Sequence, residues 1–216
     1  MPSPSRCALL STAYFGPVQY YSKFISHPET IIEKHENYPK QSYRNRCRIL
    51  AANGPLSLVI PVKKEAPKTP LARIRIDFDT DWQKLHWRSL ESAYRSAPFF
   101  EFYVDDILDF YQERHTHLFE MNMAIHGIIC GWLSIPQGKI STSYVHPIQA
   151  KCQDYRDNIH PKKQRNVHDP FFKPAPYPQV FSDKFPFQPN LSILDLIFNE
   201  GPNASAIIKQ SIPRVE

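Results

Sequence analysis

A dense run of charged and hydrogen-bonding side chains, over residues 33–48, separates two short apolar runs. Arg44, Arg46 and Arg48 carry planar, permanently charged guanidinium groups, which suit the oxygens of a carboxylate or a phosphate. Further hydrogen-bonding side chains in this run are Lys40, Gln41, Ser42, Tyr43 and Asn45. One interpretation is a solvated strand with alternating polar residues, and the other is the polar wall of a pocket for an anionic ligand.

Two histidines and one aspartate are the candidate acid–base groups. His35 or His86 could act as the general base, because histidine alone titrates near neutrality without help from its surroundings. Asp195 lies in an otherwise apolar helical pattern, and a buried carboxylate needs a positive or hydrogen-bonding partner. The arginines at positions 44–48 are the expected partner. Asp195 would then orient the base or a lysine, or it would only fix the C-terminal segment onto the sheet.

Two further groups of side chains could contact a ligand. Tyr14 and Gln19 flank the expected start of a helix after the first strand, where backbone N–H groups can receive an anion. Lys84, Trp87 and Arg88 are three and four residues apart, so they gather on one side of a helix. They could hold a ligand by charge and stacking, or they could form the edge of an amphipathic helix.

The composition favours a small anionic partner. The chain has 216 residues, is 42% hydrophobic and can therefore bury a core, and its formal net charge is +5. This mild excess suits nucleotides, acyl groups and other carboxylates, or polysaccharide precursors, whereas a nucleic-acid binder would carry a concentrated basic face. The chain has only 6 glycines and no Walker or Rossmann pattern, which excludes a Gly-rich phosphate loop.

The cysteines and the apolar segments bear on the cellular compartment. The four cysteines are Cys7, Cys47, Cys130 and Cys152. They are far apart and have no paired metal-ligand spacing, so we expect reduced thiols and no metal site, and the motifs imply no particular cofactor. No stretch approaches the ~20 apolar residues of a membrane span, and the first ten residues do not form a signal peptide. These features predict a cytoplasmic protein.

Alternating short strands and helices predict an α/β fold with a mixed sheet. The expected strands are Cys7–Ala13, Glu29–Glu33, Arg46–Leu50, Leu56–Val62, Leu71–Asp79 and Lys139–Val145. A turn at Tyr14–Pro17 joins the first strand to a helix over Val18–Ile25, for which Pro17 suits the first position. Asn53-Gly54 between the third and fourth strands is a strong signal for a central β-hairpin.

The middle of the chain, residues 80–135, is predicted to be helical. Thr80 and Gln83 match a capping box. The expected helices are residues 80–94, Phe99–Gln112, Thr116–Leu133, a short one over Cys152–Ile159, and Leu191–Asn199 after an Asn190 N-cap. Residues 160–189 are rich in proline but also in aromatic side chains, which predicts an irregular segment packed over the core. We expect residues 1–216 to form one domain.

Three blocks, at residues 11–21 with 40–49, at 81–100, and at 177–181 with 187–203, together resemble the WbqC-like family of bacterial surface-polysaccharide gene clusters. The first joins STAYFGPVQYY at residues 11–21 with KQSYRNRCRI at residues 40–49. The second is DWQKLHWRSLESAYRSAPFF at residues 81–100, and the third joins YPQVF at 177–181 with FQPNLSILDLIFNEGPN at 187–203. They occur in order along nearly the whole chain, and their details are most similar to the branch found in the Bacteroides group.

The resemblance implies a cytoplasmic protein of O-antigen or capsule precursor assembly that modifies a nucleotide-linked sugar. The positions that match the family pattern are Tyr14, Lys40, Ser42, Asn45, Arg46, Arg48, Lys84, His86, Trp87, Tyr94, Asn190, Ser192 and Asp195. The chain departs from the pattern at Ser11–Ala13, where typical members have His-Gln-Pro. It departs again at Lys34 and His35, where they tend to be acidic.

Two functions from different classes fit these residues. One is a group transferase, and the other is a non-catalytic binding module for an anionic partner or carrier protein. In the transferase, Lys40, Arg44 and Arg46 would hold phosphate or carboxylate, and Tyr14, Gln19 and Asn45 would orient the substrate. Because the polar run leads into a hairpin and matches a family block, we favour the pocket wall, with Asn45 and Arg46 at its centre.

Overall fold

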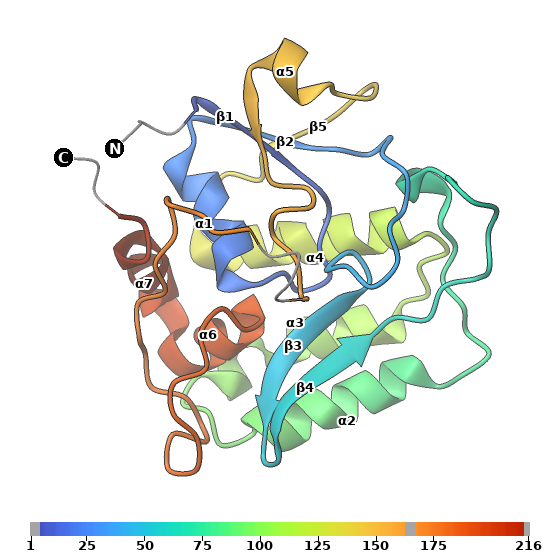
Figure 1. Cartoon of the computed structure of the whole chain (residues 1–216). Helices are drawn as coiled ribbons and strands as arrows, with labels where there is room; N and C mark the ends of the chain where they lie inside the picture. Colours follow the sequence, from blue (N-terminus) through green and yellow to red (C-terminus); the bar gives the residue numbers. More distant parts are fainter. Residues whose placement is uncertain (1–4, 163–166, 214–216) are drawn as a thin grey trace.

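Four short parallel strands form one sheet of the protein, which lies near the top of the view in Figure 1. The computed structural model describes residues 5–162 and 167–213. The strands are β1 (Cys7–Leu10), β2 (Glu29–Ile32), β5 (Lys139–Ile140) and β6 (Cys152–Asp154), in the order β5-β2-β1-β6. Strand β1 lies between β2 and β6, and its four residues are all buried, as an uninterrupted apolar sequence in a parallel sheet requires.

Helix α1 (Val18–Ser26) carries the chain from β1 to β2. Pro17 is its N-cap residue, with an extended backbone (φ −69°, ψ 163°), and not the first residue of the helix as expected. Strand β2 lies on one side of β1 and β6 on the other, so the strand order reverses between β1 and β6. In open parallel sheets, ligands bind at the carboxyl ends of the strands beside such a reversal.

The central β-hairpin, β3 (Arg46–Ala51) and β4 (Gly54–Val59), forms an antiparallel sheet of its own. Gly54 in its turn has φ of 105°, a conformation that side chains with a Cβ rarely adopt. Ser192 from the C-terminal part of the chain donates its backbone N–H to the carbonyl of Arg48 at 2.7 Å. Helix α2 also contacts β3 and runs alongside the hairpin in Figure 1. The hairpin is therefore fixed by segments that follow it in the sequence.

Helices make up the middle and the end of the chain. The middle contains η1 (Leu71–Arg73), α2 (Trp82–Tyr94), α3 (Phe100–Gln112) and α4 (Leu118–Leu133). The later ones are α5 (Pro147–Ala150), α6 (Ile193–Glu200), η2 (Gly201–Asn203) and α7 (Ala204–Gln210). Helix α6 begins after Ser192, whose hydroxyl accepts a hydrogen bond from the Leu194 N–H, so Ser192 and not Asn190 is the N-cap.

The α/β class is confirmed, with the N-terminal strand–loop–helix, the central hairpin, the helical middle section and the C-terminal helix all present. Between residues 167 and 189, and at 160–162, the described chain has only turns and extended segments. No helix among the described residues combines the length and the apolar character needed to cross a membrane.

Three expected elements are wrong, because the backbone pairing of these segments differs from what their local sequence predicts. Leu71–Asp79 contains a 3-10 turn and two isolated bridges, Val62 with Ile76 and Arg75 with His117, because no strand within residues 5–162 and 167–213 runs along it. The expected strand over Lys139–Val145 is reduced to the two residues of β5. The expected helix at Cys152 is strand β6, because its backbone pairs with β1.

The capping box at the start of α2 is also wrong. The helix begins at Trp82, and its N-cap residue Asp81 makes no side-chain hydrogen bond to the helix. The Gln83 amide instead donates to the carbonyls of Tyr111 at 2.7 Å and Glu113 at 2.9 Å. Gln83 therefore joins α2 to the C-terminal end of α3 and supplies partners for carbonyl groups at that end.

Two of the four cysteines form a disulfide, so the expectation of reduced thiols is wrong for them. Cys7 and Cys152 lie opposite each other in the β1–β6 register, with Cα atoms 4.5 Å apart, and their sulfurs are bonded. Cys47 and Cys130 are free and buried. Burial raises the pKa of Cys130 to about 12, so its thiol is protonated and unreactive near neutrality.

Candidate functional site

A pocket of ≈ 430 Å³ opens at the carboxyl-end side of the sheet, and we call it the crevice. Its walls come from α1, from the segment between β2 and β3, from β3 and from the chain after β6. The crevice is lined by Gln19, Tyr43, Arg48, His160, Pro161, Val167, His168, Asp169, Phe172, Pro174, Pro189 and Asn190. Gln19 lies in the first turn of α1, which follows the carboxyl end of β1, and His160 lies in the segment that follows β6. The residues directly after β1 and β6 line a separate, much smaller space of ≈ 20 Å³.

A reciprocal pair of amides joins the two ends of the chain at the crevice. The Gln19 backbone N–H donates to Asn190 Oδ1 at 2.9 Å, and Asn190 Nδ2 donates to Gln19 Oε1 at 3.0 Å. Asn190 has φ of 55°, a left-handed conformation that asparagine tolerates better than most residues. The Gln19 amide nitrogen then donates to Asp169 Oδ2 at 2.9 Å. Both side chains are thereby held in one orientation.

A buried ion pair neutralises the acidic side of the crevice. Lys23 Nζ lies 2.5 Å from Asp169 Oδ2, and their side chains are 0% and 7% exposed. Burial lowers the pKa of Lys23, and the Asp169 carboxylate opposes that shift. The ammonium also lies 4.7 Å from the centre of the Tyr155 ring. Because Lys23 is committed to Asp169, this aspartate adds little net negative charge to the crevice.

Arg48 supplies the crevice with an uncompensated positive charge. Its side chain is half-buried, and over residues 5–162 and 167–213 its guanidinium has neither a carboxylate nor a hydrogen-bond partner. Tyr43 lies beside it: burial raises the pKa of Tyr43 to about 12, and the charge of Arg48 opposes that shift. A half-buried guanidinium without a partner is suited to bind a carboxylate or a phosphate.

Arg44 is committed to the protein interior beneath the crevice. Its guanidinium binds Glu36 in a bidentate pair, at 2.9 and 2.7 Å, and also donates to the carbonyl of Arg156 at 3.2 Å. Glu36 accepts a further short hydrogen bond from the hydroxyl of Ser11. These groups surround the carboxyl end of β1. Arg44 therefore has a structural role, because the Glu36 carboxylate already compensates its positive charge.

The remaining residues of the polar run do not form one continuous wall. Ser42 donates its hydroxyl to the Pro39 carbonyl at 3.0 Å, and Asn45 donates its amide to the Ile60 carbonyl at 2.9 Å. Arg46 is half-buried and does not line the crevice. Lys40 and His35 are exposed and lie outside it as well. Of the predicted binding residues, the crevice thus brings together Gln19 and Tyr43.

His86 belongs to a different pocket, between β4 and α2. This pocket has a volume of ≈ 510 Å³ and shares no lining residue with the crevice. His86 Nδ1 lies 2.8 Å from the hydroxyl of Tyr14, which also hydrogen-bonds to the hydroxyl of Tyr111. Burial lowers the pKa of His86 to about 4, while a hydrogen bond with the Val59 backbone opposes the shift. His86 and Tyr14 form a buried aromatic network away from the crevice.

Asp195 is fully buried, but the expected arginine partner is wrong. Its Oδ2 accepts a hydrogen bond from the Tyr94 hydroxyl at 2.8 Å. Its Oδ1 accepts from the Tyr177 hydroxyl at 2.8 Å and from the Gln179 amide at 2.9 Å. Burial raises the pKa of Asp195, and the three hydrogen bonds oppose that shift. Asp195 and Tyr94 therefore join α6, α2 and the C-terminal segment within the core.

Lys84 and Trp87 do not join the crevice either. Lys84 is exposed, and Trp87 is half-buried against the hydrophobic core. The sequence interpretation instead missed His160, His168 and Asp169 as lining residues. The sequence around them has no helical or strand periodicity that would predict where they lie. They come close to Gln19 because the chain returns to α1 after β6. The one available signal was chemical: titratable side chains in a segment rich in proline and aromatic residues.

The buried histidines predict a loss of stability in acid. Burial lowers the pKa of both His27 and His86 from 6.5 to about 4, so the unfolded chain takes up these protons first as the pH falls. The stabilisation is present above pH 6.5 and is lost on the way down to about pH 4. We expect His86→Gln to flatten this part of the profile, measured by urea unfolding at several pH values. Exposed His146→Gln is the matched control, and identical profiles for the wild type and His86→Gln would contradict the assignment.

Comparison with known proteins places this architecture in a family. The chain belongs to the WbqC-like protein family, which it matches over residues 12–160 and 156–207. It is 26% identical to the uncharacterized protein Rv1507c of Mycobacterium tuberculosis (strain ATCC 25618 / H37Rv) over 226 residues, which cover 92% of this chain and 95% of that protein. No solved structure matches the chain. Both matched ranges contribute to the crevice, since Gln19 and Arg48 lie in the first and Asn190 in the second.

Proposed function

We propose that this WbqC-like protein is a cytoplasmic group transferase of surface-polysaccharide precursor biosynthesis. Its substrate is a nucleotide-linked sugar or a related phosphate or carboxylate, bound in the crevice. The observation that carries the proposal is the half-buried guanidinium of Arg48, which lines the crevice and has no partner among the described residues. The volume of ≈ 430 Å³ is within the usual range for small-molecule sites.

Different lining residues take part in substrate binding and in the chemical step. Arg48 holds the phosphate or carboxylate, because a planar guanidinium can donate two parallel hydrogen bonds to either group. The fixed amides of Gln19 and Asn190 orient the neutral part of the substrate. His160 takes the role of general base that the sequence suggested for His86 or His35, because His160 lines the crevice and those two do not.

Arg48→Gln tests the binding role directly. Hydrogen bonds to a charged group contribute about 1.5–3 kcal/mol, so we expect the dissociation constant for an anionic ligand to rise roughly 10- to 100-fold. The ligand is first found by a thermal-shift screen with nucleotide-linked sugars, acyl-CoAs and amino acids. A ligand at about 100 times its dissociation constant stabilises the folded state by roughly 2.7 kcal/mol. Affinities are then measured by isothermal titration calorimetry.

Arg95→Gln removes an arginine charge at an exposed position outside the crevice and is the matched control. An unchanged dissociation constant in Arg48→Gln would contradict the site. Binding of a nucleotide-linked sugar that is never turned over, with any acceptor offered, would contradict the transferase and leave a non-catalytic binding module as the function.

A further inference from the structure

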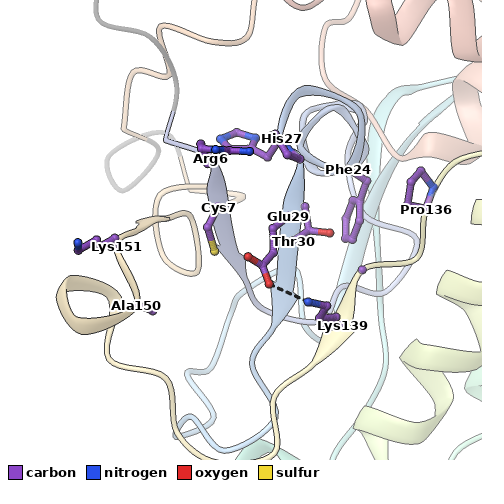
Figure 2. Close-up of a pocket in the computed structure, with 12 residues that line it drawn as sticks. Arg6, Cys7, Phe24, His27, Glu29, Thr30, Pro136, Lys139, Ala150 and Lys151 are labelled. Carbon is purple, nitrogen blue, oxygen red and sulfur yellow. Dashed lines mark hydrogen bonds and ion pairs between the residues drawn. The ribbon is translucent and has the colours of Figure 1, made fainter.

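A second pocket, of ≈ 740 Å³, opens at the amino ends of the parallel strands (Figure 2). We call it the amino-end pocket. It is lined by Arg6, Cys7, Phe24, His27, Pro28, Glu29, Thr30, Pro136, Gly138, Lys139, Ala150 and Lys151. No residue is shared with the crevice, and nothing in the proposed transferase reaction uses this pocket.

The disulfide forms part of the wall of the amino-end pocket. Cys7 begins β1 and lines the pocket, and its partner Cys152 begins β6, the edge strand of the sheet. Cys7 is 6% exposed and Cys152 is half-buried. The bond is therefore placed at the rim of the sheet, where a small molecule can reach it through the pocket. The free thiols Cys47 and Cys130 are buried and have no such access.

The amino-end pocket carries an excess of positive charge around this bond. Arg6 and Lys151 are the chain neighbours of Cys7 and Cys152, and both line the pocket. Figure 2 marks the ion pair of Lys139 with Glu29, at 2.9 Å, which cancels the one acidic side chain of the lining. Neither Arg6 nor Lys151 has a carboxylate partner in the part of the chain that the structure describes. Burial lowers the pKa of His27 to about 4, so His27 adds no charge near neutrality.

Positive charge favours thiol–disulfide exchange in two ways. It stabilises the cysteine thiolate that leaves when the disulfide breaks, as cations do at reactive cysteines. It also raises the local concentration of an anionic reactant, and electrostatic attraction of this kind accelerates association by factors of 10 or more at low salt. The two effects coincide in a pocket large enough for a small organic thiol.

We propose that Cys7–Cys152 is a thiol–disulfide exchange site that selects small anionic thiols, namely thiols that also carry a carboxylate or a sulfonate. The thiolate attacks the sulfur of Cys7 from the pocket, a new sulfur–sulfur bond forms, and Cys152 leaves as a thiolate. A second thiolate attacks the external sulfur of this mixed disulfide and releases Cys7 as a thiolate. The protein gains two electrons, and the small thiol is oxidised to its disulfide.

The test compares three small thiols of different charge on the folded, full-length protein. They are 2-mercaptoethanesulfonate (anionic), 2-mercaptoethanol (neutral) and cysteamine (cationic), each normalised to its rate with an uncharged small disulfide. The readout is the time course of alkylation at Cys7 and Cys152, resolved by mass spectrometry of the peptides. We expect the anionic thiol to react about tenfold faster than the neutral one in low salt, and the cationic thiol to be the slowest. The preference is expected to disappear at 1 M salt, where the Debye length is about 3 Å.

Lys139→Gln keeps the disulfide but leaves Glu29 unpaired, so one of the two excess positive charges of the amino-end pocket is lost, and the variant is expected to reduce the preference for the anionic thiol. Lys64→Gln, at an exposed position outside the pocket, is the matched control and is expected to retain the preference. Equal normalised rates for the three thiols would overturn the proposal. So would the same preference in Lys139→Gln and the wild type, or free Cys7 and Cys152 thiols in protein purified without reductant.

Discussion

Arg44→Ala is expected to lower the free energy of unfolding by about 3–5 kcal/mol, the range for breaking a buried ion pair by removing one partner. The change leaves the Glu36 carboxylate charged and buried, without either of its guanidinium hydrogen bonds. The two side chains are only 3% and 9% exposed, so water cannot replace the lost partner. Urea unfolding at neutral pH, followed by circular dichroism, measures the change.

The chain provides a control of the same chemical type on its surface. Arg75 and Glu65 also form a pair at 2.9 Å, but the Arg75 side chain is 53% exposed. Arg75→Ala is expected to cost at most about 1 kcal/mol. The double variant Glu36→Gln, Arg44→Gln removes both buried charges and is expected to lose less stability than Arg44→Ala alone. Equal losses for Arg44→Ala and Arg75→Ala would show that the Arg44 pair is not buried as described.

Asp195→Ala is expected to be similarly destabilising, by about 3 kcal/mol or more. It removes the acceptor for the hydroxyls of Tyr94 and Tyr177 and for the Gln179 amide, and each buried donor left without a partner costs roughly 1–3 kcal/mol. Asp195→Asn keeps the shape and one acceptor oxygen, so it is expected to lose less. Thermal and urea unfolding of both variants give the comparison, and a neutral effect of Asp195→Ala would contradict the assigned network.

The Asp195→Asn variant also tests the raised pKa of the Asp195 carboxyl group. Burial raises the pKa of Asp195 above the 3.8 of an ordinary carboxyl, so the folded state holds the proton more tightly than the unfolded chain does. This contribution to stability is complete below pH 3.8 and is lost as the pH rises through the higher pKa of the folded state. The stability of the wild type relative to Asp195→Asn is therefore expected to fall as the pH is raised from 3.5 to 7. If the difference in stability between the wild type and Asp195→Asn did not change with pH, the pKa of Asp195 would not be raised in the folded state.

Local signals were sufficient for most of the fold. The Asn53-Gly54 turn predicted the hairpin, and the apolar spacing in the helical section predicted α2, α3 and α4 within a few residues. The errors fall on segments whose structure depends on a distant partner. The three residues of β6 are a strand only because β1 is beside them, and the pairing of Cys7 with Cys152 follows from the same register. Cysteine connectivity cannot be read from spacing alone.

The candidate site was less predictable, for a related physical reason. A sequence shows which residues carry charge but not which charges are already compensated. Arg44 and Arg48 look equivalent in the polar run, yet Arg44 is bound to Glu36 and Arg48 has no partner among the described residues. Asp195 was recognised as a buried carboxylate, but its partners are two tyrosines and a glutamine from distant segments. The crevice contains His160 and Asp169 only because the chain returns to α1 after β6.

The contacts of residues 190–192 determine when the crevice can form during synthesis of the chain. Ser192 binds the Arg48 carbonyl through its N–H and the Phe15 carbonyl through its hydroxyl, at 2.7 and 2.8 Å, and Asn190 fixes Gln19. These partners are translated long before residues 190–192 leave the ribosome. The nascent chain can form the β1–α1–β2 unit and the hairpin early, but it has no complete crevice until this segment docks. Binding at the proposed site should therefore begin only after residues 190–192 have been translated, and a truncation before Asn190 would separate folding of the N-terminal half from binding.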